Sequence, residues 1–454
     1  MPKPVVFIPG FPASELRDAA TNEVVFPPSP GTLLSGSRKR KFFELMLDVP
    51  GRLVAGPPIR SVLNLAKQAQ SLYDLLEHFG YTIAREGPSV DFAPVGWDWR
   101  LGVDAEPTMN AVATAIAGFA PQKVVVVLHS TGGLVFRAFL ARHPELVDSI
   151  DEVLAFGAAW CGTLEALYAV HEGRAQTILG IPLMTADESA NLIGHAQAAY
   201  DLFPPDPART DLDDVKLVHG LDGHLKGANV DLSWIKANRR DYAVPRAQSA
   251  NERLGARPRD FELPLTNVVG WGAATHPGAV LEEQDIHFLP DEKDAGDGTV
   301  PRLSASWIRG PHVRTLLVPI GAFVADPIAD RHAHMWDSLA VTDIFRELFR
   351  PGTPRNPFVA AAADSDDAID LNSGSVTIRL TAQSNDGQPL PNCIATARII
   401  KKKIPIPFQG RTSAIFRLNR QGIESNFGHL FRFEIDFTWD GGSRKNVAVA
   451  FRAP

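Results

Sequence analysis

The chain has 454 residues, of which 45% are hydrophobic and 21% are charged, and its formal net charge is −7. Such a composition is typical of a globular protein with two or three domains, and the negative charge argues against nucleic acid as a partner, because nucleic-acid binding needs a basic surface. Two cysteines cannot form a disulfide framework, no apolar run approaches the roughly 20 residues of a spanning helix, and the N-terminus lacks a signal-peptide pattern. We therefore expect a soluble protein that is cytoplasmic by default, with an oligomeric state that the sequence leaves open.

The first part of the chain alternates short apolar strands with helices. Residues 5–8 (VVFI) predict a strand that ends at a Pro-Gly turn, and the apolar spacing over 59–79 predicts a helix. A strand-like stretch at 90–100 (VDFAPVGWDWR) and a helix near 108–119 follow. Between the first strand and the first helix, residues 18–60 are rich in Pro, Gly and Ser, and they are predicted to form an irregular insertion.

The segment from Lys123 to Gly133, KVVVVLHSTGG, combines an unbroken apolar run with a tight turn and a helix-like continuation. This is the context that a G-x-S-x-G nucleophile elbow requires, in which the serine hydroxyl is lifted above the end of a buried strand. Leu128 stands where the consensus has glycine and implies a local packing adjustment. An ordinary turn in which Ser130 caps the helix is the alternative, since serine is a favoured N-cap residue.

The same alternation continues after the elbow. Residues 150–156, 265–272 and 313–320 predict further buried strands, and a last helix is expected over 340–349. Residues 164–264 interrupt the pattern with short helical pieces and polar loops, which predicts a cap inserted between core strands. Strands that alternate with helices indicate an α/β fold with a doubly wound, mostly parallel sheet.

The composition changes near residue 350. Residues 351–367 are predicted to be a linker that ends the catalytic domain at 1–350. Beyond it, residues 368–454 alternate apolar and polar side chains with period 2, which predicts a small β-sandwich-like module with one buried face per strand. The sequence leaves the role of this module open. The alternation of its aromatic residues indicates that they belong to the core of the module rather than to a binding face.

A serine nucleophile needs a base and an acid downstream, in the order Ser, Asp or Glu, His in α/β-hydrolases. Asp297 in AGDGTVP is the best acid, with Asp294 as the nearby competitor. His332 in DRHAHMWDS is the best base, because it lies between the last core strand and the last helix, although spacing alone does not separate it from His334. The oxyanion would be bound by the backbone amides of Phe11, in the loop after the first strand, and of Thr131.

Five segments in this order resemble the lecithin:cholesterol acyltransferase family, which includes lysosomal phospholipase A2 and phospholipid:diacylglycerol acyltransferase. They are PGFPASEL, PVGWDWRLG, LHSTGG, FGAAWCGT and GDGTVP, and the W-D-W-R block is the most specific of them. The resemblance covers residues 4–350 and implies an α/β-hydrolase fold with Ser130, Asp297 and His332 as the triad. Trp97 and Trp160, in two of these segments, are predicted to contact substrate.

The chain also departs from the family pattern. Trp97 replaces the signature Tyr, and Ala159 and Cys161 alter the family's G-A-P-W-G-G loop. The disulfide-closed lid of the secreted animal members cannot form, because its cysteines are missing. Lid structure and acceptor preference are therefore the family properties that the resemblance supports least for this chain.

Together these features predict a serine-dependent acyl-transfer enzyme that acts on lipid esters such as phospholipids or acylglycerols, without a cofactor or a metal. Lipase or phospholipase activity and O-acyl transfer use the same residues, so the sequence leaves both open, along with a transient contact with a membrane surface. A catalytically silent α/β-hydrolase that serves as a binding or scaffolding protein is the alternative from another class.

Overall fold

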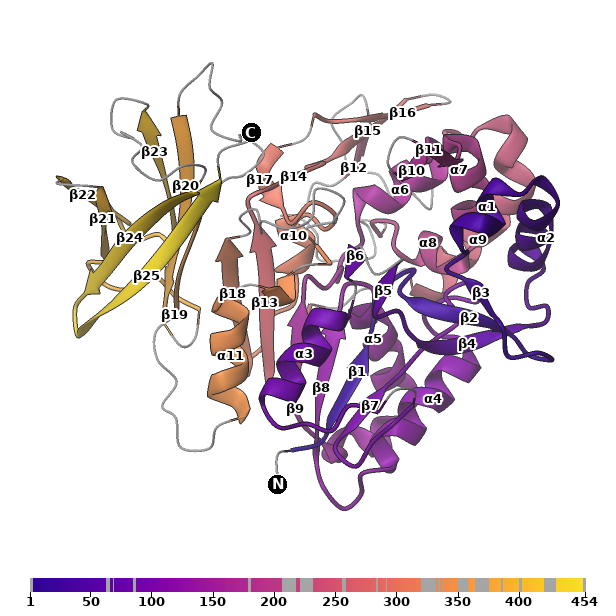
Figure 1. Ribbon diagram of the computed structural model, residues 1–454, viewed down its shortest axis with the longest axis horizontal. Coiled ribbons are helices and arrows are strands. Elements are labelled where there is room, and N and C mark those ends of the chain that lie inside the picture. Colours follow the sequence, from indigo (N-terminus) through magenta and orange to yellow (C-terminus); the bar gives the residue numbers. More distant parts are fainter. Residues whose placement is uncertain are drawn as a thin grey trace.

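The computed structural model describes most of the chain. The described residues are 3–62, 66–67, 69–84, 87–178, 181–205, 218–220, 232–254, 259–282, 285–290, 292–319, 332–333, 335–337, 339–349, 358–363, 375–384, 387–399, 402–419 and 430–451. Their centre is a six-stranded sheet in the order β18-β13-β9-β8-β1-β7 (Figure 1), and every neighbouring pair in it is parallel. The predicted parallel sheet is therefore confirmed.

The strands of this sheet match the apolar runs of the sequence. They are β1 (Val5–Ile8), β7 (Phe92–Pro94), β8 (Val124–His129), β9 (Ile150–Phe156), β13 (Leu265–Trp271) and β18 (Val313–Pro319). Every residue of β1, β8 and β13 is buried, as expected for strands covered on both faces.

Helices cover both faces of the sheet, which is the arrangement of the α/β-hydrolase fold (Figure 1). One face packs against α4 (Glu106–Ala117) and α5 (Gly132–Arg142), and the other packs against α3 (Gln70–His78) and α11 (Leu339–Phe349). Successive residues of β8 point to opposite faces. Leu128 belongs to the buried cluster under α4 and α5, so the core accommodates a leucine where the elbow consensus has glycine.

The predicted irregular insertion at 18–60 is wrong, because this stretch is regular. It contains β3 (Val24–Phe26), α1 (Pro30–Leu34), α2 (Gly36–Leu47) and β4 (Leu53–Pro58), and both strands pair with β2 (Ser14–Asp18). The prolines mark element boundaries here: Ser29 caps α1 with its side chain and Pro30 opens it. Phe42 and Met46 bury one face of α2.

The helix predicted over 59–79 is shorter than its apolar spacing suggested. Among the described residues of this stretch only α3 is helical, while β5 (Ser61–Val62) and β6 (Ala66–Lys67) pair antiparallel before it. The amide of Ala69 donates to the carbonyl of Ile59, and both side chains are buried. A few apolar residues at helical spacing can thus be buried by two short paired strands, which periodicity alone does not distinguish from a helix.

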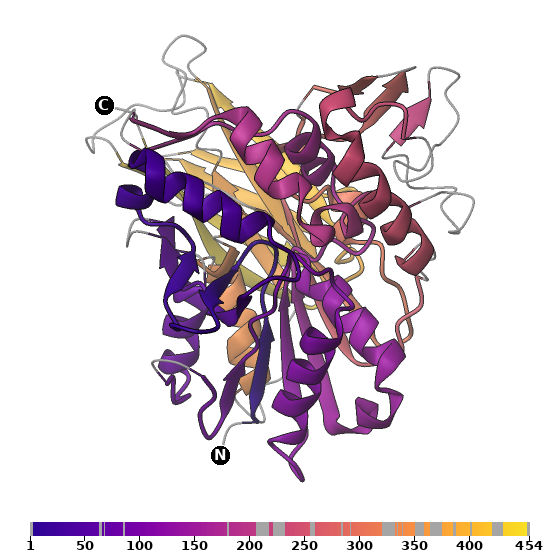
Figure 2. The ribbon, with the colours of Figure 1, turned by 90° about the vertical axis from the view of Figure 1, so that its right-hand side faces the viewer.

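The segment predicted as a cap lies above the carboxyl ends of the strands (Figures 1 and 2). Its described elements are α6 (Leu164–His171), β10 (Gln176–Ile178), β11 (Ile181–Met184), α7 (Ala186–Gly194), α8 (Gln197–Asp201), β12 (Val218–Gly220), η3 (Ala237–Arg239) and α9 (Arg240–Leu254). Between β13 and β18 the chain adds β14 (Ala273–Thr275), β15 (Ala279–Glu282), β16 (Asp285–Phe288), β17 (Glu292–Gly296) and α10 (Arg302–Ala305).

The C-terminal region is all-β and has its own buried core. Its strands are β19 (Phe358–Ala363), β20 (Ser375–Gln383), β21 (Ile394–Ile399), β22 (Lys402–Pro407), β23 (Ser413–Asn419), β24 (Leu430–Trp439) and β25 (Gly442–Phe451). They form two sheets, β19-β20-β23 and β22-β21-β24-β25, around a separate hydrophobic cluster. Strand β19 falls inside the stretch 351–367 that was predicted to be a linker. Part of that stretch therefore belongs to the module, paired with β20 through an alanine run that carries little sequence signal.

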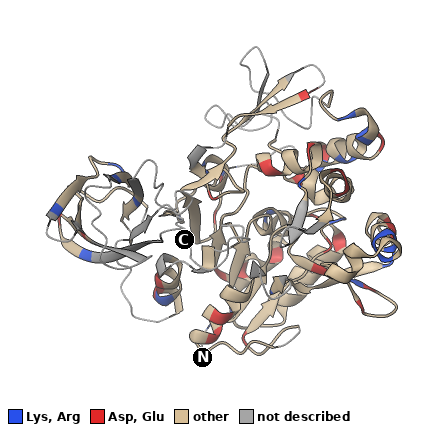
Figure 3. Cartoon of the chain, turned by 45° about the horizontal axis from the view of Figure 1, so that its top comes forward, with Lys and Arg blue, Asp and Glu red and all other residues tan. Residues whose placement is uncertain are grey.

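Basic and acidic residues are interspersed along the described ribbon (Figure 3). In the part of the chain that the structure describes, no helix combines the length and the apolar character that crossing a bilayer demands.

Candidate active site

Ser130 lies at the carboxyl end of β8, in a turn that leads directly into α5. Its backbone φ is +52°, a left-handed conformation that is strained for a residue with a side chain and is typical of a nucleophile elbow. The Ser130 amide donates to the carbonyl of Phe156 at 3.0 Å, which ties the turn to β9. A Cβ on Gly132 would lie 2.4 Å from the carbonyl oxygen of Ile8, so only glycine lets α5 begin this close to β1.

Asp297 and His332 form a buried hydrogen-bonded pair. His332 Nδ1 lies 2.7 Å from Asp297 Oδ2, and the side chains are 4% and 0% exposed. Because the carboxylate accepts, Nδ1 carries the proton and Nε2 is the nitrogen available as a base. The other carboxylate oxygen, Oδ1, accepts the amides of Thr299 at 3.0 Å and Val300 at 2.7 Å, which fixes the carboxylate in place. The side chain of the competing Asp294, and all of His334, fall outside the described residues.

Two glycines, Gly10 and Gly157, pack closely against Ser130 and against the Asp297–His332 pair, respectively. A Cβ on Gly10, in the loop after β1, would lie 2.6 Å from Cβ of Ser130. A Cβ on Gly157, directly after β9, would lie 2.8 Å from both Asp297 Oδ2 and His332 Cε1. Ser130, the Asp297–His332 pair and the loop after β1 therefore all lie at the carboxyl edge of the sheet, where open α/β sheets bind their ligands.

The tryptophans of the W-D-W-R block hold the loop that carries Phe11. Trp97 Nε1 donates to the carbonyl of Pro9 at 3.1 Å, and Trp99 Nε1 donates to the carbonyl of Ser14 at 3.3 Å. The ring of Trp99 also meets the ring of Phe11 edge-on, with centroids 5.3 Å apart. These contacts fix both ends of the loop whose Phe11 amide is predicted to bind the oxyanion, while Thr131 opens α5 on the other side.

The predicted substrate contacts of Trp97 and Trp160 are not visible in this conformation. Both side chains have no exposed surface, and Trp160 Nε1 donates to Asn267 Oδ1 at 3.1 Å. Their observed contacts are those of residues that position the site. A direct contact with substrate stays a prediction for both.

Asp98 and Arg100 form a buried ion pair that connects the same block to the first insertion. Arg100 Nη2 lies 2.7 Å from Asp98 Oδ2, and both side chains are at most 7% exposed. The remaining guanidinium hydrogens are donated to three backbone carbonyls of the insertion, those of Leu45, Asp48 and Leu53. The block therefore orders both the loop after β1 and the insertion beside it.

The structure adds one residue that sequence reasoning missed. His129, directly before Ser130, donates from Nε2 to the carbonyl of His332 at 3.1 Å, and the centroids of the two rings lie 4.6 Å apart. Burial, together with the neighbouring His332 ring, lowers the pKa of His129 to about 3, so this side chain stays neutral. The only signal in the sequence was its place in HSTGG, since its partner is 203 residues away.

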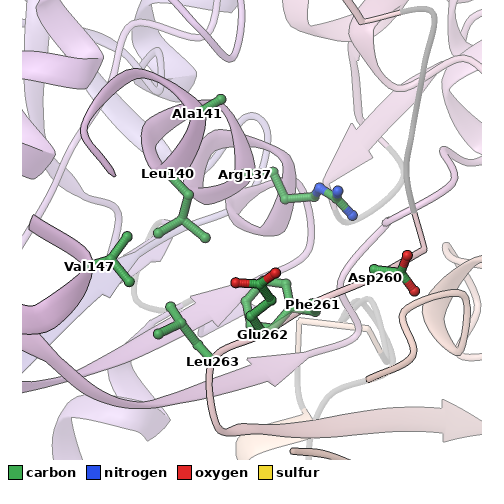
Figure 4. A pocket seen from close by; sticks show the side chains of 8 residues that line it. All are labelled: Arg137, Leu140, Ala141, Val147, Asp260, Phe261, Glu262 and Leu263. Carbon is green, nitrogen blue, oxygen red and sulfur yellow. The ribbon is translucent and has the colours of Figure 1, made fainter. Parts of the chain in front are cut away.

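A cavity of about 310 Å³ lies away from these residues (Figure 4). It is formed by later turns of α5, the 3₁₀ helix η1 (Pro144–Ser149) and residues 260–263 before β13, with Arg137, Asp260 and Glu262 among its lining residues. No triad candidate lines it. Among the described residues, no group of three or more His, Cys, Asp or Glu side chains is arranged to hold a metal ion.

Comparisons with known proteins place the chain in a family. The lecithin:cholesterol acyltransferase family model matches residues 61–294, just over half of the chain. No curated protein matches the sequence. The Tle4–Tli4 complex contains a similar fold at 13% identity, covering 77% of this chain and 97% of that one with a TM-score of 0.50.

Two further solved structures are more distant. The Bacillus licheniformis lipase BlEst2 in its propeptide form shares 11% identity over 99% of this chain and 93% of its own, with a TM-score of 0.30. Phospholipase PlaB from Legionella pneumophila shares 9% identity over 98% and 90%, also with a TM-score of 0.30. Because the family model matches more than half of the residues, the chain belongs to the lecithin:cholesterol acyltransferase family.

Proposed function

We propose that this protein is a serine-dependent lipid acyl-transfer enzyme with Ser130 as nucleophile, His332 as general base and acid, and Asp297 as the residue that orients His332. Family membership supports acyl transfer from, or hydrolysis of, a lipid ester. The observation that carries the assignment of residues is the buried Asp297–His332 pair, which lies against Gly157 beside the strained turn of Ser130. We assign this machinery to a catalytic unit at residues 1–350.

The proposed first half-reaction forms an acyl-enzyme. Ser130 Oγ attacks the ester carbonyl carbon while His332 Nε2 takes the hydroxyl proton. The tetrahedral oxyanion is stabilised by the backbone amides of Phe11 and Thr131. When the intermediate collapses, the bond to the leaving oxygen breaks and His332 returns the proton to that oxygen. The lysolipid or other alcohol departs, and the acyl chain stays on Ser130.

The second half-reaction decides between hydrolysis and transfer. His332 takes a proton from water or from an acceptor alcohol, whose oxygen attacks the acyl-enzyme carbonyl. Collapse of the second intermediate returns the proton to Ser130 Oγ and releases a fatty acid or a new ester. Both routes use the same residues, so the outcome depends on how well the cap excludes water and holds an acceptor.

The test is a product analysis. The purified protein is incubated with vesicles of mixed phospholipids and acylglycerols, with and without a long-chain alcohol, and the products are identified by mass spectrometry. We expect fatty acid or new esters from the wild type and none from Ser130→Ala. Products formed equally by Ser130→Ala would refute the assignment, and no product from the wild type with any ester would favour a binding protein.

A further inference from the structure

Strand β20 of the C-terminal module contacts the end of β13 in the catalytic unit. Trp271, the last residue of β13, donates from Nε1 to Thr381 Oγ1 of β20 at 3.2 Å. The two residues are 2% and 0% exposed, so the hydrogen bond is buried. The guanidinium of Arg379, also on β20, lies over the Trp271 ring at 6.0 Å from its centroid.

The same strand covers the free edge of the central sheet. An edge strand presents unpaired amides and carbonyls, and β18 is the edge strand on this side. The Gln383 side chain binds this edge as a backbone segment would: its Oε1 accepts the Leu317 amide at 2.7 Å, and its Nε2 donates to the Thr315 carbonyl at 3.2 Å. Gly387 packs against the same carbonyl so closely that a Cβ would lie 2.5 Å from it.

From Trp271 a short, continuous path leads to the proposed catalytic acid. After Gly272, strand β14 pairs with β17, and Ala273 forms a bridge with Asp297. The hydroxyl of Thr275 accepts the amide of Gly298 at 2.8 Å, next to that acid. The position of Asp297 is therefore set by a two-stranded antiparallel pair, β14 and β17, whose first strand begins two residues after the side chain that Thr381 holds.

We infer that the C-terminal β-module braces the active site, with Thr381 and Gln383 as positioning residues for Asp297 and, through it, for His332. This inference rests on the proposed function. It assigns the module a mechanical role in the catalytic machinery: β20 fixes Trp271 and the edge of β18, and the β14–β17 strand pair next to the acid is anchored to Trp271. A module that serves only to bind a separate partner would not need these buried hydrogen bonds to the end of β13.

A matched pair of substitutions in the full-length chain tests the brace. Thr381→Val keeps the shape of the side chain and removes the acceptor, whereas Thr381→Ser keeps the hydroxyl. We expect kcat for a soluble ester to fall by about 10-fold to 100-fold in Thr381→Val with KM nearly unchanged, because displacements of 1 Å can cost about 100-fold in rate. Thr381→Ser should recover most of the rate, and Ile394→Thr, at an exposed position of the module's other sheet, should match the wild type.

Two further readouts separate positioning from folding. Hydrogen exchange of the paired strands β14 and β17 should accelerate in Thr381→Val, and exchange of the Leu317 amide should accelerate in Gln383→Met, relative to Ile394→Thr. The low-pH limb of the kcat/KM profile of Thr381→Val should move to lower pH, because a displaced Asp297 stabilises the protonated imidazole less.

Each outcome decides a separate claim. Unchanged exchange in both variants would overturn the brace. Faster exchange with unchanged kcat would overturn its role in positioning the acid. If Thr381→Val does not fold, the exchange and the kcat of Gln383→Met still decide between these outcomes. A wild-type protein that hydrolyses no ester would refute the proposed function, and with it the catalytic role of the brace, while exchange would still report whether β20 holds the β14–β17 strand pair.

Discussion

Replacement of Gly157 by alanine would place a methyl group between the two residues of the proposed acid–base pair. The new Cβ would lie 2.8 Å from Asp297 Oδ2 and 2.8 Å from His332 Cε1. To reach ordinary contact at 3.4 Å, each atom would have to retreat by roughly 0.6 Å. Both side chains are buried and hydrogen-bonded to each other, so this displacement would lengthen or misalign the 2.7 Å hydrogen bond between them.

The expected loss of activity follows from that displacement. Misplacement by about 1 Å can cost about 100-fold in rate, and complete loss of the orienting acid costs roughly 10⁴-fold in a studied triad. We expect kcat of Gly157→Ala to lie between these limits, 100-fold to 10⁴-fold below the wild type. The left-handed backbone at this position, φ +53°, adds about 1 kcal/mol of strain to the folded state.

Gly80→Ala is the matched control. Gly80 also has a left-handed backbone, with φ +88°, but an added Cβ would meet nothing within 4 Å. Both variants should lose thermal stability from backbone strain, with a further loss of about 1–3 kcal/mol from overpacking in Gly157→Ala, while only Gly157→Ala loses activity. The assay is steady-state hydrolysis of a p-nitrophenyl ester, together with thermal unfolding of each variant. A kcat within threefold of the wild type for folded Gly157→Ala would refute the placement of the pair.

Three other substitutions test the supporting contacts. His129 has a pKa near 3 in the fold against about 6.5 when unfolded, so only the unfolded chain takes up a proton as the pH falls below 6.5. Stability should decline by about 1.4 kcal/mol per pH unit from this group between pH 6.5 and 3, and urea unfolding of His129→Gln should show a shallower decline; equal slopes would contradict this. Trp97→Phe removes the bond to the Pro9 carbonyl and should lower kcat about fivefold to tenfold at constant KM, whereas a rise in KM alone would favour a substrate contact. Arg100→Ala leaves the Asp98 carboxylate buried without its partner and should lower the free energy of unfolding by about 3–5 kcal/mol in denaturant titrations; a loss below 1 kcal/mol would show that the pair contributes little.

The parts of the fold that could be predicted from sequence are those with a local signal. The unbroken apolar runs located β1 and β9 to the residue, and the turn after β8 identified the elbow and its serine. The order of acid and base along the chain selected Asp297 and His332, which the structure brings to a 2.7 Å contact. The strand predictions are confirmed because buried parallel strands restrict the residue types they accept, whereas the catalytic roles of Asp297 and His332 stay predictions.

Other features depend on contacts between distant segments and leave no local signal. The first insertion forms regular structure because β2 pairs with β3, which precedes α1, and with β4, which follows α2. Its composition alone is typical of a loop. Strand β19 ends in four alanines, and it is a strand because it pairs with β20. The role of His129 likewise depends on a carbonyl far along the chain.

The central claim is that Ser130 is an activated nucleophile, and active-site labelling tests it most directly. A fluorophosphonate reacts with a serine only when a base and an oxyanion site activate it. We predict that the wild-type protein is labelled stoichiometrically, that peptide mapping places the adduct on Ser130, and that Ser130→Ala and His332→Ala are not labelled. A folded wild-type protein that stays unlabelled, or an adduct on another serine, would contradict the account.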